Sequence, residues 1–143
     1  ENYSTVVTDQ DLAEAVTDEY GVKYSPDGTR LLKAPEDLAE HYEIKTGTKV
    51  ICAKADGVTS IGDFAFVECE SLASVTIRGS VTSIGSYAFK GCESLASIVI
   101  PDGVMSIGDS AFMCCSSLAN IIIPDGVTSI GDSAFYWCGS LAS

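Results

Sequence analysis

Six cysteines are the residues of this 143-residue chain best suited to chemistry, as metal ligands, disulfides or nucleophiles. Two of them, Cys52 and Cys114, are irregularly placed, whereas four recur every 23 residues: Cys69, Cys92, Cys115 and Cys138. If these four stack as rungs about 4.8 Å apart, their sulfurs spread along about 14 Å, which tetrahedral zinc cannot use. Parallel Cβ directions on adjacent rungs also leave sulfurs awkwardly placed for bonding. We expect buried free thiols, with one disulfide as the alternative, and no metal or cofactor.

The other candidates for chemistry point away from catalysis. His41 is the sole histidine, and its polar, acidic surroundings contain no recognisable Ser or Cys signature, so we expect a surface residue. No D-x-D-x-D-G calcium loop is present, and a solvated loop face is the preferred interpretation of four recurring aspartates, Asp102, Asp109, Asp125 and Asp132. Asn2-Tyr3-Ser4 fits the glycosylation pattern, but three residues carry little information. We predict that the chain is not an enzyme.

Composition and charge exclude several classes of partner. Eight Lys and Arg against twenty Asp and Glu give a net charge of −12, so the positive footprint that nucleic acid and anionic lipid require is missing. Hydrophobic residues make up 46% of the chain, which is enough for a packed core. There is no uninterrupted apolar run long enough to span a membrane. We expect neither nucleic-acid binding nor membrane insertion.

A repeat of 23 residues must position these side chains. Each copy reads approximately V-x-x-I-G-x-x-A-F-x-x-C-x-S-L-x-x-I-x-I-P-x-G, and Phe66, Phe89, Phe112 and Phe135 mark its register. The Leu-x-x-Ile-x-Ile segment predicts a short strand, and stacked copies predict a parallel sheet with a continuous core. Ala-Phe-x-x-Cys is consistent with a single helical turn, and the glycine after each Ile-Gly step suits a bend. The sequence predicts an α/β fold, a right-handed solenoid with a parallel β-sheet and short helical turns.

This copy resembles the BspA-type (Treponema-type) leucine-rich repeat, whose motif residues 57–143 match almost throughout. The match departs at Arg78-Gly79-Ser80, where other copies have Pro-Asp-Gly, so that loop is expected to follow a different path. The resemblance implies a bacterial or protist protein that is secreted or displayed on the cell surface, its signal peptide presumed removed. It implies an adhesin-like interaction surface for a host or cell-surface protein rather than a reaction.

Two regions are predicted: residues 1–43 as an N-terminal cap and residues 44–143 as the solenoid. In the cap, Thr8-x-x-Asp11 predicts a helix carrying Leu12, Val16 and Tyr20 on one face, and residues 21–32 predict a hairpin around Pro-Asp-Gly. Residues 1–7 are expected to include disorder.

The two ends of the solenoid are expected to be irregular. Residues 44–51 resemble 100–107 at an offset of 56, which is 13 short of three repeats, so the first coil is predicted to be shortened after Ala55 and to lack its own strand. The last coil is incomplete, because the sequence stops at Leu141-Ala142-Ser143. That uncapped C-terminal end is expected either to be truncated or to be covered by a second copy in a homodimer.

The exposed side of the predicted sheet is the best candidate for binding. If Leu and both Ile point inward, the intervening residues face solvent in two rows: Thr76, Val99 and Ile122, and Ser74, Ser97 and Asn120. Adjacent exposed aliphatics mark many protein contacts, although β-propensity alone also explains Val99 and Ile122. We predict a protein-interaction module that binds through this face; the alternative is a structural spacer or display module of the cell envelope without its own ligand.

Overall fold

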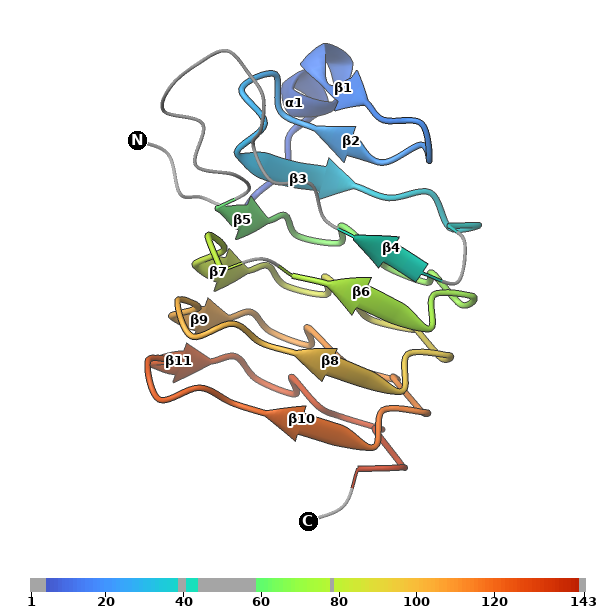
Figure 1. The fold of residues 1–143 in the computed structure, drawn as a ribbon, viewed down its shortest axis with the longest axis vertical. Coiled ribbons are helices and arrows are strands. Elements are labelled where there is room, and N and C mark those ends of the chain that lie inside the picture. The colour runs from blue at the N-terminus through green and yellow to red at the C-terminus, as the bar shows by residue number, and fades with distance from the viewer. Residues whose placement is uncertain (1–4, 39–40, 44–58, 78, 142–143) are drawn as a thin grey trace.

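The structure, a computed structural model, describes residues 5–38, 41–43, 59–77 and 79–141. Figure 1 shows a solenoid whose coils stack from the N-terminal helix and hairpin down to the red C-terminal coil. The elements in chain order are α1 (Asp9–Glu14), β1 (Val16–Thr17), β2 (Lys23–Tyr24), β3 (Arg30–Lys33), β4 (His41–Glu43), β5 (Ser60–Ile61), β6 (Ser74–Thr76), β7 (Ser83–Ile84), β8 (Ser97–Val99), β9 (Ser106–Ile107), β10 (Asn120–Ile122) and β11 (Ser129–Ile130).

Two parallel ladders run along the solenoid, where the sequence predicted one. The expected ladder comes from Leu-x-x-Ile-x-Ile and pairs β4 with β6 and β8 with β10. The second comes from the Ser-Ile pair of each copy (β5, β7, β9 and β11), and the cap strands β1, β2 and β3 extend it into a sheet in the order β1-β2-β3-β5-β7-β9-β11, with β1–β2 and β2–β3 antiparallel. Between strands of the repeats both keep the 23-residue register, as in Ser97 beside Asn120 and Ser83 beside Ser106. Each coil therefore contributes one strand to each ladder (Figure 1).

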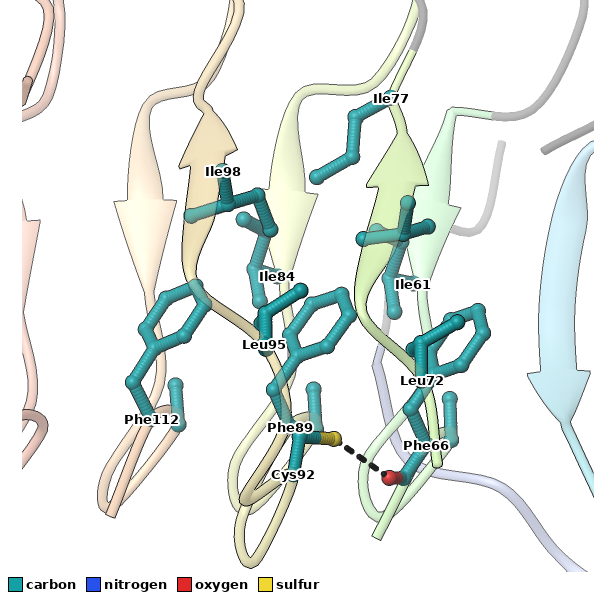
Figure 2. Packing of buried hydrophobic residues seen from close by; sticks show 14 of the residues in the cluster. Ile61, Phe66, Leu72, Ile77, Ile84, Phe89, Cys92, Leu95, Ile98 and Phe112 are labelled. Carbon is teal, nitrogen blue, oxygen red and sulfur yellow. Dashed lines mark hydrogen bonds between the residues drawn. The ribbon is translucent and has the colours of Figure 1, made fainter. Parts of the chain in front are cut away.

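The core is a set of stacked identical side chains (Figure 2). Phe66 and Phe89 have ring centroids 4.9 Å apart and planes within 5°, and Phe89 and Phe112 follow at 5.2 Å and 2°. Leu95 and Ile84 pack beside these rings and are 0% and 1% exposed. The ring spacing is close to the roughly 4.8 Å separation of neighbouring strands. Each core side chain therefore stacks on the residue that lies 23 positions further along the chain. The 23-residue period is thereby converted into a continuous apolar core.

The predicted helical turn at Ala-Phe-x-x-Cys is wrong, because three overlapping tight turns replace it, the middle one closed by the Val67 amide, which donates to the Phe64 carbonyl at 3.2 Å. The amide of Ala65 donates to the Gly62 carbonyl and that of Cys69 to the Phe66 carbonyl, each at 3.2 Å. Positive φ at the third position of these first and last turns, at Phe64 (62°) and Glu68 (58°), identifies both as type II turns. The amides of alternate residues in this segment donate to the next coil instead, as Phe66 N does to Ala88 O at 2.7 Å. A helical turn would direct these amides along the chain and break the bonding between coils.

The glycine of each Ile-Gly step was expected to supply a bend, but the structure gives a different reason for it. None of the described glycines at this step has positive φ. A Cβ at Gly108 would instead lie 2.5 Å from Ser86 N and 2.6 Å from Gly85 C, both backbone atoms of the preceding coil. Only a residue without Cβ allows two coils to approach this closely.

The N-terminal cap forms the predicted hairpin and a shorter helix than predicted. Thr8 and Asp11 make a reciprocal capping box, but α1 ends at Glu14, so Val16 lies in β1 and the expected face extending to Tyr20 does not form. The hairpin pairs β2 with β3, and β3 then pairs in parallel with β5. Arg30, at the start of β3, holds the helix through an ion pair with Asp11 at 3.1 Å.

Strand β4 extends the first ladder into the segment predicted as cap. Residues 41–43 pair in parallel with β6, and Tyr42 enters the core beside Phe66, with ring centroids 6.2 Å apart. Its hydroxyl donates to Asp18 Oδ2 at 2.6 Å, which joins the cap to this strand. The predicted shortening after Ala55 lies outside the described residues, and the boundary between residues 43 and 44 stays a prediction.

Candidate partner-binding face

Strands β6, β8 and β10 present one row of side chains to the core and two rows outward. Val75 and Ile98 are buried, whereas the residues that follow them, Thr76 and Val99, are exposed. This alternation arises because successive side chains of a strand point to opposite faces. The predicted outward rows are thus confirmed as exposed, with Ser74 half-buried. No contact with a partner tests them as binding residues.

The two aliphatic residues of the outer row are the most exposed large hydrophobic side chains among the described residues. Val99 is 80% exposed and Ile122 is 81% exposed. They occupy directly paired positions of β8 and β10, so they lie side by side on adjacent rungs. Ser97 and Asn120 form the next pair on the same strands, and both are exposed. The face therefore has an aliphatic centre bordered by neutral polar groups.

His41 extends the polar row, which the residue pattern did not predict. It is exposed as predicted, but its Nδ1 lies 2.6 Å from Ser74 Oγ across the β4–β6 pairing. The two residues are 33 positions apart rather than 23, so the repeat alone gave no signal for this contact. An exposed pair on an open strand face fits a surface for recognition better than a reaction centre.

The cysteine ladder is a structural element of the core. Cys92 Sγ donates to the Phe66 carbonyl at 3.2 Å (Figure 2), and Cys115 Sγ donates to the Phe89 carbonyl at 3.1 Å. Burial raises the pKa of Cys115 to about 12, so its thiol is protonated and unreactive at neutral pH. The expectation of buried free thiols is confirmed for Cys69, Cys92 and Cys115; Cys114 and Cys138 are free but half-buried. Cys52 lies outside the described residues.

Other clusters offer no competing site within the described ranges. The four recurring aspartates are exposed, as expected, and no group of three or more His, Cys, Asp or Glu residues there could hold a metal. Asp109 is used internally, because its Oδ1 accepts from the Asp132 amide at 2.8 Å. An open groove of about 360 Å³ lies over the other sheet, between Thr5 and the serines of β9 and β11. It is on a different ladder from the predicted binding residues.

Comparison with known proteins agrees with this geometry. The profile of the BspA type Leucine rich repeat region (6 copies) matches residues 48–143. The chain belongs to the BspA-type leucine-rich-repeat family. The resemblance found in the sequence is confirmed, and so is the solenoid fold. Such repeats typically form a protein-interaction fold rather than an enzyme. No curated protein sequence matches the chain.

Several solved structures of bacterial leucine-rich-repeat proteins share this fold. A leucine-rich repeat protein from Bacteroides capillosus is 32% identical with a TM-score of 0.73, and the alignment covers 91% of this chain and 96% of that one. A leucine rich cell surface protein from Faecalibacterium prausnitzii is 29% identical with a TM-score of 0.67, and the alignment covers 90% of this chain and 38% of that one. The pneumococcal vaccine antigen PcpA is 22% identical, so it supports the fold only; its TM-score is 0.78, and the alignment covers 90% of this chain and 29% of PcpA. The BspA-type chain thus spans under a third of PcpA.

The solved relatives and the described helices bear on where a BspA-type chain such as this one is located. One relative is described as a cell surface protein. Among the helices of the described residues, none has the length and hydrophobicity needed to cross a bilayer. The homodimer expected at residues 141–143 stays a prediction, because the structure holds one chain and residues 142–143 lie outside its described part.

Proposed function

We propose that this chain is an adhesin-like protein-interaction module of a secreted or surface-displayed bacterial protein. Its partner, a host or cell-surface protein, contacts the exposed face of β6, β8 and β10. The observation that carries the proposal is the paired exposure of Val99 and Ile122, at 80% and 81%. Burying an aliphatic side chain of this size stabilises a contact by roughly 1.5–3 kcal/mol, so a partner that covers both side chains gains this contribution twice.

The flanking polar row adds direction to such a contact. Ser97 and Asn120 carry hydroxyl and amide groups that both donate and accept hydrogen bonds. The His41 ring and the Ser74 hydroxyl extend this row by two rungs. An apolar centre with a polar rim is the usual composition of a protein–protein interface.

The test is binding of the purified chain to an array of secreted and cell-surface proteins of bacterial and host origin. Val99→Asp with Ile122→Asp is expected to remove the bound spots, because carboxylates then replace the aliphatic contact. Met105→Asp is the matched control, since Met105 is 55% exposed but lies between β8 and β9. Circular dichroism should show both variants folded, because exposed substitutions change stability by about 0.5 kcal/mol or less.

Unchanged spots for the folded double variant would refute binding through this face. Absence of any spot for the unmodified chain would favour the spacer or display role.

A further inference from the structure

The acidic residues of the repeats divide into those that the fold uses and those that it leaves at the surface. Residues 57–143 contain eight acids and two bases. The fold uses three of them. Asp63 Oδ1 accepts from the Ser86 amide and Asp109 Oδ1 from the Asp132 amide, each at 2.8 Å. Glu68 forms an ion pair with Lys90 at 3.6 Å. Four carboxylates share a different environment: exposed turns beside the strands of the binding face, at Glu70, Glu93, Asp102 and Asp125.

These four acids lie at the two ends of the strands of this face: Glu70 and Glu93 precede β6 and β8, and Asp102 and Asp125 follow β8 and β10. Asp102 and Asp125 follow Val99 and Ile122 by three positions, which limits each Cα–Cα separation to about 10 Å. The turn at Asp102 is closed by the Val104 amide, which donates to Pro101 O at 3.1 Å. Over such a span the interaction is partly screened in physiological salt, where the Debye length is about 8 Å, and these charges act more strongly on a group bound at the centre when the salt concentration is low.

The arrangement also places like charges beside each other. Asp102 and Asp125 occupy equivalent positions of adjacent coils, and Glu70 and Glu93 do so at the opposite end of the strands. None of the four makes an ion pair within the described part of the chain. Neighbouring carboxylates repel each other, and a cation brought between them relieves that repulsion.

We propose that the occupant of this face is a basic polypeptide segment, an inference that rests on the proposed function. An apolar side chain of the segment covers Val99 and Ile122, and Lys or Arg side chains on either side reach the two acidic turns. Charge complementarity selects this partner over a second copy of the chain. A two-fold contact between identical faces would bring acidic turn against acidic turn.

The experiment selects binders to the immobilised chain from a displayed library of random 12-residue peptides. Peptides that bind the unmodified chain and fail to bind Val99→Asp with Ile122→Asp are sequenced. We expect Lys and Arg to be enriched around an apolar residue. Asp102→Lys with Asp125→Lys should then weaken the affinity for a selected synthetic peptide roughly tenfold in low salt. The affinity should also depend less on salt concentration, since charges at the rim of an interface mainly affect the rate of association.

The matched control is Glu14→Lys with Asp132→Lys, which changes the net charge equally but lies away from the face; binding should stay within about twofold. Binders that need Val99 and Ile122 but show no enrichment in basic residues would overturn the basic partner and leave the proposed face intact. Failure of the face itself is read separately, from the protein array. Light scattering that showed a dimer, converted to monomer by the double Asp variant, would identify a second copy as the occupant and overturn the proposal.

Discussion

Gly108→Ala should destabilise the solenoid although it adds a single methyl group. The new Cβ would lie 2.5 Å from Ser86 N and 2.6 Å from Gly85 C. Ordinary contacts to carbon are about 3.5–4.0 Å, so the overlap is roughly 1 Å against backbone on the preceding coil. Relief requires the two coils to separate where Gly108 N donates to Ile84 O at 2.8 Å. Overpacking of this kind costs about 1–3 kcal/mol.

The matched control is Gly79→Ala, because a Cβ there meets nothing within 4 Å. Both substitutions restrict the unfolded chain, which stabilises by about 0.4–1 kcal/mol in each case and therefore cancels from the comparison. We expect Gly108→Ala to be about 2 kcal/mol less stable than the control. With an unfolding entropy of about 2.1 cal/mol/K per residue, that difference lowers Tm by about 7 °C.

The assay is thermal and urea unfolding followed by circular dichroism, which reports the whole solenoid. Equal midpoints for the two variants would mean that the coils separate without cost, and the explanation for glycine at this step would be refuted.

Three further expectations follow from the core. Phe89→Ala should lower the free energy of unfolding by about 3–5 kcal/mol in urea titrations, because it opens a cavity in the ring stack, whereas Val99→Ala should change it by less than about 0.5 kcal/mol; similar losses would contradict the assignment of inward and outward rows. Iodoacetamide at pH 8 should label half-buried Cys114 well before buried Cys115, as mass spectrometry of peptides would show; equal labelling rates would contradict the burial. Since the pKa of Cys115 is raised from 9.0 to about 12, its contribution to stability is present below pH 9 and is lost as pH rises toward 12, so the urea midpoint should fall less over that range in Cys115→Ala.

Much of the fold could be predicted because the repeat is local and strict. One strand per copy, the inward Phe, Leu and Cys, and the outward Val99 and Ile122 all follow from a period of 23 and the alternation of a strand. The hairpin and the capping box could also be predicted, because each is formed by residues that lie close together in the sequence. The candidate face could be predicted for the same reason, although its partner could not.

The remaining features depend on contacts between coils, which no local pattern contains. The Ser-Ile segment becomes a strand only because an equivalent backbone lies beside it, and the turns are type II because alternate amides bond to the next coil. Strand β4 was missed because Tyr42 replaces the expected aliphatic residue and the interval to β6 is 33 positions.

The repeat length, the inward and outward rows and the family can all be read from the order of the residues. Those properties depend on the order of side chains along one strand and on the regular recurrence of the coils. The second ladder, the close approach at Gly108 and the contact between His41 and Ser74 emerge only when the coils are stacked. Each of these depends on the distance between backbones of different coils, which packing of the whole solenoid sets.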